Sequence, residues 1–416
     1  MKILTSSNPD KSECHLLVVF TVCNIAYLPK ALVLAESVIR FTGHPLKIFL
    51  FDRKVNFSYP EESAEIIWME DLDVTNFYQM AFIYDIIEFS TSLKPFIANL
   101  LLQTSNKVIF LDPDTAVFSS LEPILEDLNQ NPVVLTPHYR KPQPDTDTES
   151  DLAMMRFGSL NLGFFAVRKS PEAEEFLSWW SRRCIDFSFM ESQFGLSTDQ
   201  KWISIAPCFF DFLKISFNSG YNAAPWNTFE REITLLRDGK YFLGDGNPLV
   251  FFHFSNFDHS DPQYLNKRAS SENNISYELL EKLGLDYSRN LKEMESAVEK
   301  VPYSFDYMSD GSYISPTLRR AYASIKNSLP NGHNPFDSAG QVGSFASQNY
   351  LLEKNNVKYS YPSLKESAKH SKKFLLVYFL MRLALRVLGP NRFYDLSKLM
   401  VYLSIYRKNT NLWKLK

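Results

Sequence analysis

Cysteine is scarce in this sequence. Its 416 residues contain four, at Cys14, Cys23, Cys184 and Cys208, and they form no Cys-x-x-Cys pair or other zinc-binding spacing. That absence excludes a structural zinc site built on thiolates. Each cysteine lies in or beside an apolar run, so we expect buried, reduced thiols, as in a cytosolic protein.

The glycine-rich loops of common nucleotide-binding motifs are also missing. The chain has no Gly-x-Gly-x-x-Gly and no Gly-x-x-x-x-Gly-Lys, which excludes the dinucleotide-binding fingerprint and the P-loop. Charge of one sign is lacking too, because the formal net charge is only -3. A nucleic-acid partner is therefore not expected.

No apolar run has the length or the flanks of a targeting or spanning segment. Ser6 to Glu13 is polar, and the apolar run from Leu16 to Val22 lacks a cleavage signature, so we expect no signal peptide. Phe374 to Leu388 is apolar except for Arg382 and Arg386, but it is short for a membrane span. The predicted location is the cytoplasm.

What the sequence does contain is an alternation of strands and helices in its first half. Strands are predicted at 16–21, 46–51 and 65–69, and a helix at 28–41. This alternation predicts an α/β fold with a Rossmann-like, mostly parallel central sheet flanked by helices.

One strand ends in a pair of acidic residues. Val108 to Leu111 reads as a buried parallel strand, and it is followed by Asp112-Pro113-Asp114. Alternate residues of an extended segment point to the same side, at the edge where open α/β sheets bind ligands. Two carboxylates there suit Mg²⁺ or Mn²⁺ and a nucleotide-sugar diphosphate. The alternative is a strand end closed by a turn-forming Asp-Pro-Asp sequence.

Three later residues allow a functional and a structural interpretation. Lys94, near the expected start of a helix capped by Ser92, suits a phosphate or is a solvated lysine. Asp199 is a catalytic candidate or a partner of a helix dipole. His253, in an apolar strand, is the natural third metal ligand or a core histidine.

The ordered set of these motifs resembles the GT-A nucleotide-sugar transferases, over about residues 15 to 260. It looks closest to the retaining family 8 group, which includes glycogenin and bacterial lipopolysaccharide galactosyltransferases. The motifs are Cys23-Asn-Ile-Ala-Tyr27, Lys94, Phe110-Leu-Asp-Pro-Asp-Thr115, Asn161-Leu-Gly163, Asp199-Gln200 and His253-Phe254.

The resemblance implies a role for each matching residue. The uridine would be held by Thr21, Asn24 and Tyr27, and the donor would be contacted by Lys94. The metal, Mn²⁺ or Mg²⁺, would be bound by Asp112, Asp114 and His253. The sugar pocket would include Asn161 and Gly163, and the reactive face of the sugar would meet Asp199 and Gln200.

Two departures from the family pattern stand out. Leu162 replaces the usual serine between Asn161 and Gly163, and the lysine that grips the leaving diphosphate is missing after His253. Lys267 or Arg268 would have to replace that lysine. The segment from Asn218 to Asn227, in contrast, fits the acceptor side of the family.

The resemblance implies a metal-dependent glycosyltransferase that moves a sugar, with retention, from a UDP-linked donor to a glycan or lipid-linked glycan acceptor. Two alternatives remain: a haloacid-dehalogenase-type phosphatase and a non-catalytic glycan-binding protein. The phosphatase family has Thr or Val two places after its second Asp, where this chain has Ala116, and a later acidic pair that is absent here.

The last third of the chain differs from the rest in its pattern and its charge. We expect a GT-A catalytic domain over 1–262 and a mainly helical C-terminal extension over 263–416. From residue 365 onward, twelve Lys or Arg face two acidic residues, a net charge of +10. The apolar segment there would bind an anionic membrane surface, at the inner face of the membrane, or would pack in a homo-oligomer.

Overall fold

The computed structural model describes residues 15–60, 64–142, 148–261, 265, 274–330, 332–352 and 372–414. Two compact units make up the chain. The first lies within Met1–Asn76 and Ile86–Tyr303, and the second within Phe77–Asp85 and Ser304–Lys416. The expected domain boundary at residue 262 stays a prediction.

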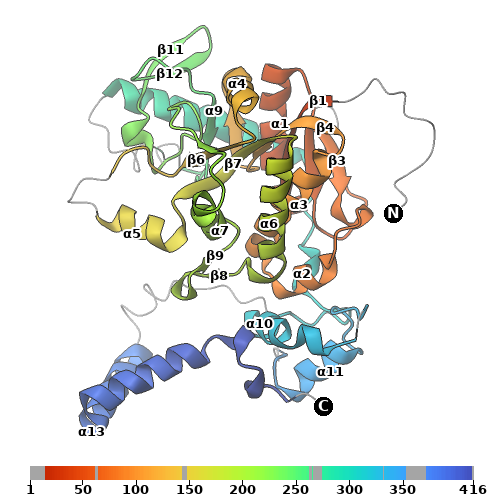
Figure 1. Cartoon of the computed structure of the whole chain (residues 1–416), viewed down its shortest axis with the longest axis vertical. Helices are drawn as coiled ribbons and strands as arrows, with labels where there is room; N and C mark the ends of the chain where they lie inside the picture. Colours follow the sequence, from red (N-terminus) through yellow and green to blue (C-terminus); the bar gives the residue numbers. More distant parts are fainter. Residues whose placement is uncertain are drawn as a thin grey trace. The chain divides into compact units, whose positions relative to one another are not determined.

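The first unit is built on a seven-stranded sheet (Figure 1). Across the sheet, the strands are β10 (Leu213–Ile215), β6 (Val133–Pro137), β7 (Leu160–Arg168), β4 (Ser105–Leu111), β1 (His15–Cys23), β2 (Leu46–Leu50) and β3 (Ala64–Trp68). All neighbouring strands are parallel except that β7 runs antiparallel to β4 and to β6. The predicted α/β class with a mostly parallel sheet is confirmed.

Helices flank this sheet. They are α1 (Leu28–Thr42), α3 (Ile86–Leu101), α4 (Glu122–Gln130), α5 (Thr148–Phe157), α6 (Pro171–Phe187), α7 (Gln200–Ile205) and α9 (Asn274–Ala297). α3 packs against α6, and α1 packs against α9. α9 therefore belongs to the first unit, although it follows the expected domain boundary in the sequence.

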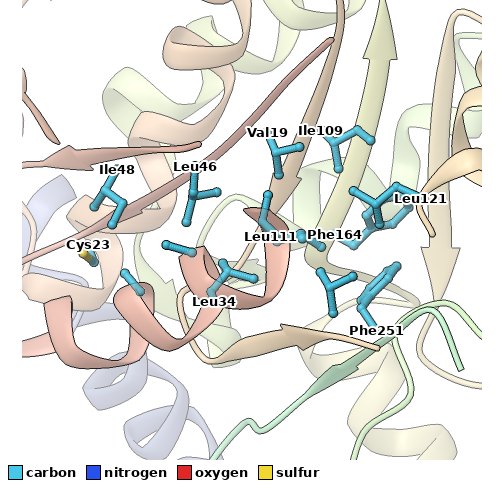
Figure 2. Close-up of a cluster of buried hydrophobic side chains, with 14 of the residues drawn as sticks. Val19, Cys23, Leu34, Leu46, Ile48, Ile109, Leu111, Leu121, Phe164 and Phe251 are labelled. Carbon is cyan, nitrogen blue, oxygen red and sulfur yellow. The ribbon is translucent and has the colours of Figure 1, made fainter. Parts of the chain in front are cut away.

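The core between α1 and the sheet explains why these segments take their positions. Figure 2 shows Leu34 of α1 among apolar side chains of β1, β2 and β4, such as Val19, Ile48 and Ile109. All four are essentially inaccessible to solvent. Full burial of such a side chain stabilises the fold by about 1.5–3 kcal/mol, so the apolar runs determine which segments become strands.

Three two-stranded sheets complete the first unit. They are β5 (Thr115–Val117) with β13 (Phe251–His253), β8 (Met190–Glu191) with β9 (Leu196–Ser197), and β11 (Ile233–Arg237) with β12 (Lys240–Leu243). The first pair matters most here, because it joins the end of β4 to a segment far away in the sequence.

Two expectations about local structure were wrong. The helix expected to begin at Ser92 begins at Ile86, and the Ser92 hydroxyl donates to the carbonyl of Phe89 one turn earlier instead of capping a terminus. Cys208 is exposed, whereas Cys23 and Cys184 are buried as expected. Cys14 lies outside the described residues.

The second unit is mainly helical, as predicted for the C-terminal extension. Its helices are α2 (Phe77–Ile83), α10 (Pro316–Ile325), α11 (Gln341–Gln348) and α13 (Lys372–Leu403). α13 is interrupted at Gly389, where φ is 78° and ψ is 164°, and Pro390 follows. Among the described residues, no helix combines the length and the apolarity that crossing a bilayer requires.

Candidate functional site

The turn after β4 is held in place by its neighbours on both sides. The N–H of Asp112 donates to the carbonyl of Gly163 at the start of β7, at 2.9 Å. The N–H of Thr115 donates to the carbonyl of Asp112, at 3.0 Å, so the chain turns immediately into β5. Asp112 and Asp114 thus lie beyond the carboxyl end of a central strand, where we expected them.

Strand pairing brings the histidine to this turn. β13 runs antiparallel to β5 with His253 opposite Thr115, and the N–H of Phe254 donates to the carbonyl of Asp114 at 2.7 Å. The backbone therefore places His253 beside Asp114, although 139 residues separate them in the sequence.

The three side chains converge on one point. His253 Nε2 lies 3.1 Å from Asp114 Oδ1 and 3.7 Å from Asp112 Oδ2. One ligand atom from each of Asp112, Asp114 and His253 lies within 4.8 Å of the others, so the group could hold a metal ion. Two carboxylate oxygens and an imidazole nitrogen are hard or borderline ligands that suit Mn²⁺ or Mg²⁺.

The electrostatics of this group favour a cation. Burial alone would lower the pKa of His253, but the Asp114 carboxylate raises it above its usual value. Burial would likewise raise the pKa of Asp114, and the imidazolium holds it below its usual value. A proton on His253 offsets the charge of the carboxylates, and a metal that binds here would compete with that proton for the imidazole nitrogen.

Gly163 makes room for the histidine ring. A Cβ built on this residue would meet Cε1 and Nδ1 of His253 at 2.4 Å, well inside van der Waals contact. The N–H of Gly163 donates to Asn161 Oδ1 at 2.8 Å, and Asn222 Nδ2 donates to the same oxygen at 3.0 Å. A glycine within a strand often marks such a close approach, and here its partner is the candidate metal ligand.

Lys94 is buried between the two acidic parts of the site. Its ammonium donates to the carbonyl of Leu162 at 2.9 Å, and it lies 3.0 Å from Asp112 Oδ1 and 3.8 Å from Asp199 Oδ2. Burial would lower the pKa of Lys94, but Asp112 and then Asp199 raise it above its usual value. A solvated first-turn lysine is therefore wrong, because only 4% of the side chain is exposed. In this structure Lys94 orients Asp112.

Asp199 is a buried carboxylate, and one of its oxygens accepts no hydrogen bond within the described residues. It occupies the N-cap position of α7 but makes no capping hydrogen bond, and among the described residues no donor reaches its Oδ2. Burial raises the pKa of Asp199 to about 6, although Lys94 acts in the opposite direction. The preceding Thr198 has a φ of 47°, a strained value for a β-branched residue, and its hydroxyl donates to Asp199 Oδ1 at 3.1 Å.

Gln200 connects three segments around the same pocket. Its Oε1 accepts from the N–H of Leu162 at 3.3 Å, and its Nε2 donates to the carbonyl of Phe157 at 3.2 Å. Leu162 therefore contributes both backbone groups to the site, one to Lys94 and one to Gln200. These contacts do not depend on the side chain at 162, where the chain departs from the family pattern.

The residues expected to hold the nucleoside follow β1. Asn24 is buried, and Tyr27 is 45% exposed with the Lys30 ammonium 4.4 Å from its ring centroid. The short 3₁₀ turn between them, Ile25–Tyr27, is held by Asp52, whose Oδ2 accepts from the N–H of Ile25 at 2.7 Å. Asp52 follows β2, and sequence reasoning did not assign it a role.

Most of these groups line a cavity of about 670 Å³ in the first unit. Ten of the eleven predicted site residues line it: Asn24, Tyr27, Lys94, Asp112, Asp114, Asn161, Gly163, Asp199, Gln200 and His253. The exception is Thr21, which is fully buried in β1 and outside the lining. Its contact with a nucleoside stays a prediction.

Sequence reasoning missed His138, which follows the end of β6 and also lines the cavity. Burial lowers the pKa of His138 to about 4, so its imidazole is neutral near pH 7. Its ring centroid lies 6.1 Å from that of Trp226, which lies 5.5 Å from that of His253. A polar residue at the carboxyl end of a sheet strand was the signal that would have identified it.

Some expected replacements cannot be placed at this site. Lys267 and Arg268, which would replace the missing family lysine, lie outside the described residues. His259, six residues after His253, lies 3.4 Å from Glu295 of α9 and does not line the cavity.

Comparison with known proteins gives distant similarities. No family model matches the chain. Two uncharacterized proteins of Bacillus subtilis (strain 168) are similar: YfnF is 25% identical over 179 residues, and YfnD is 28% identical over 176 residues. Each match covers 41% of this chain, with 57% of YfnF and 54% of YfnD. The chain thus spans just over half the length of these relatives.

The similar solved structures include the galactosyltransferase LgtC in complex with donor and acceptor sugar analogs, at 15% identity and a TM-score of 0.40. That match covers 69% of this chain and 97% of LgtC. Another is the glycosyltransferase GlyE of Streptococcus pneumoniae TIGR4, at 19% identity and a TM-score of 0.37, covering 70% of this chain and 67% of GlyE. Such low identities and TM-scores carry no argument about activity, which must rest on the site.

Proposed function

We propose that this protein is a metal-dependent glycosyltransferase with a GT-A fold, which transfers a sugar from a nucleotide-diphosphate sugar. The observation that carries the proposal is the convergence of Asp112, Asp114 and His253 at the carboxyl edge of the sheet, facing a cavity. The buried carboxylate of Asp199 lines the same cavity. A donor needs both parts: a place for its diphosphate and a polar group near its sugar.

Each part of the site has a chemical task in this proposal. The cation, when bound, supplies Lewis-acid stabilisation of the departing nucleotide diphosphate. Asp112 and Asp114 provide its carboxylate ligands, with Lys94 orienting the first. His253 provides the imidazole ligand from a ring orientation that Gly163 permits. Asn24 and Tyr27, in the same lining, would hold the nucleoside, Tyr27 by stacking.

Asp199 and Gln200 are the candidates for the reactive face of the sugar. Sugar transfer passes through an oxocarbenium-like state, which an anionic or polar group below the ring stabilises. Asp199 Oδ2 has no protein donor among the described residues, so it is available to a ligand. The amide of Gln200 is committed to Leu162 and Phe157 in this structure, and we infer that it positions the pocket wall.

The finer identity of the substrates follows the resemblance. We propose a UDP-linked donor, Mn²⁺ or Mg²⁺ as the cation, retention of configuration, and a glycan or lipid-linked glycan as the acceptor. The neutral imidazole of His138 and the indole of Trp226, both in the lining, would suit the hydroxyls and the apolar face of a sugar ring.

Neither alternative gains support from the site. A phosphatase of the haloacid-dehalogenase type would need a further acidic pair, and the described residues that line the cavity include no carboxylates besides Asp112, Asp114 and Asp199. A binding protein without catalysis would have no need for the strained Thr198 that precedes Asp199.

Donor turnover with and without Mn²⁺ tests the proposal. Hydrolysis of UDP-, GDP- and CMP-linked sugars should be metal-dependent for one nucleotide class. Asp112→Ala or Asp114→Ala should lower that rate roughly a hundredfold or more, because each removes a metal ligand. Asp71→Ala is the matched control, since Asp71 is 53% exposed and lies outside the lining. Unchanged turnover in either site variant would refute the metal assignment.

A further inference from the structure

The helix α13 exposes an unusual amount of apolar surface. Its first arm, before the break at Gly389, contains seven consecutive apolar residues, Leu375 to Met381, each between 47% and 69% exposed. Exposed apolar residues continue through the rest of the first arm and the second arm: Leu383, Leu385, Val387, Tyr394, Leu396, Leu399, Met400, Val401, Tyr402 and Leu403. Apolar surface as extensive as this marks an interaction site.

The distribution of this surface indicates what kind of partner covers it. A helix turn contains 3.6 residues, so seven consecutive exposed apolar residues cover the whole circumference of the arm. A second protein helix would cover one stripe and leave the remaining apolar side chains in water. Within the second unit, no other described helix packs along α13. An apolar layer that surrounds much of the helix would cover this surface better than a second protein helix would.

The charge of the segment points to an anionic partner. Residues 372–414 contain nine Lys or Arg and a single acidic residue, Asp395. Arg382 and Arg386 share one face at i and i+4, and Tyr378 precedes them on the same face. Long basic side chains can reach phosphates while their helix lies in an apolar layer, and tyrosine favours that boundary.

The length of the arms and the position of the break decide how the helix lies. The first arm, Lys372 to Leu388, spans roughly 26 Å and the second, from Pro390, roughly 21 Å, both short of the ~30 Å hydrocarbon layer. Arg386 and Arg392 flank the break. Insertion of the two arms into the bilayer with the break at Gly389 leading would bury these two charges deeply, which is costly. An orientation parallel to the surface leaves them at the headgroups.

We propose that α13 docks this protein on an anionic lipid surface, with both arms in the boundary between headgroups and acyl chains. Arg382 and Arg386 reach the lipid phosphates, and the remaining apolar side chains enter the acyl layer. At its carboxyl end the helix is joined to the rest of the second unit, where the 3₁₀ turn Tyr406–Lys408 packs on α10. This partner is independent of the function proposed for the first unit.

Sedimentation of the full chain with vesicles tests the proposal. Vesicles with about one third phosphatidylglycerol should bind the protein at least tenfold more tightly than phosphatidylcholine vesicles, and added salt should weaken the binding. Phe379→Glu with Leu383→Glu should lower the affinity by more than tenfold, because it introduces charges into the acyl layer. Arg382→Gln with Arg386→Gln should lower it on the order of tenfold on anionic vesicles only.

Phe217→Glu is the matched control, because Phe217 is 58% exposed and lies in the first unit. It should bind vesicles as the unaltered protein does. Hydrogen exchange supplies a second readout without any variant: the amides of 375–403 should be protected on anionic vesicles. The proposal is overturned if no vesicle binds the protein, or if binding ignores lipid charge. It is also overturned if the amides of 375–403 are protected as strongly without vesicles as with them because the protein self-associates. In that case the protein would be a dimer in solution, and Phe379→Glu would dissociate it.

Discussion

A side chain at position 163 would collide with the ring that completes the candidate metal site. Its Cβ would lie 2.4 Å from two atoms of His253, and that ring is itself fixed by strand pairing and contact with Trp226. The absence of a side chain at this residue is therefore a requirement of the site, beyond any requirement of the strand.

Gly163→Ala should displace His253 and weaken Mn²⁺ binding by at least tenfold, as changes in support of a ligand usually do. Gly244→Ala is the control, because its nearest neighbour is at an ordinary 3.7 Å. Titration with Mn²⁺, alongside circular dichroism to verify folding, measures the effect. Equal metal affinity in the two variants would mean that the histidine is not a ligand.

Asp199 predicts a dependence of stability on pH. Its folded pKa of about 6 is above the model-peptide value, so its contribution to stability is present at low pH and is lost as the pH rises through 6. The amide of Asp199→Asn does not titrate, so this variant does not lose that contribution to stability as the pH rises. The variant should gain roughly 2–3 kcal/mol relative to the unaltered protein between pH 4 and pH 8.

Urea unfolding in the presence of a chelator, at several pH values in this range, measures the difference in the free energy of unfolding between the two proteins. A difference that stays constant across the range would show that Asp199 is ionised in the fold throughout, and the physical argument for its burial would fail.

At the scale of single residues, the sequence predicted the site residues that follow strands, but not those whose role depends on packing. Asp112 and Asp114 were identifiable because an apolar strand ends at them. The burial of Lys94 was not, since it depends on α3 beginning at Ile86, six residues before the expected cap. His138 was passed over because its neighbours, Trp226 and His253, are close only in the fold.

At the scale of elements, the buried guanidinium of Arg319 links α10 to α2. Arg319 donates to the carbonyls of Ala81, Phe82 and Tyr84 at the end of α2, and to the carbonyl of Phe305 and the carboxylate of Asp306. The side chain is 3% exposed. This one residue satisfies carbonyls that a short helix leaves without partners.

Arg319→Leu should destabilise the second unit by about 3–5 kcal/mol, because it leaves buried acceptors and a buried carboxylate without their donor. Arg289→Leu, at a side chain 66% exposed on α9, should change stability by less than about 0.5 kcal/mol. Hydrogen exchange of the amides in 77–85 measures the local effect. Unchanged protection of this segment in Arg319→Leu would contradict it.

The order of strands and helices along the chain was largely predictable from the sequence, but the pairing of strands was not. The strands expected in the first half begin and end within three residues of their observed positions, because apolar runs bounded by polar residues define them. The antiparallel direction of β7 and the pairing of β5 with β13 depend on contacts between distant segments, which a pattern along the chain does not encode.

At the scale of the whole molecule, the two units differ in what covers their apolar residues. The first unit buries them in its own core and opens a cavity whose lining includes the charged and polar groups of the candidate site. The second carries a helix whose apolar surface is exposed. Composition alone indicated this division, since the last 52 residues carry a net charge of +10 in a chain whose total is -3.

The central claim is that three residues brought together by β4, β5 and β13 hold the cation that anchors a nucleotide sugar. Electron paramagnetic resonance of Mn²⁺ in the presence of UDP tests it most directly. We expect one Mn²⁺ per chain, bound more tightly with UDP than without it, and at least tenfold more weakly by Asp114→Asn or His253→Ala. One tightly bound Mn²⁺ with the same affinity in both variants, or none with UDP present, would contradict the account.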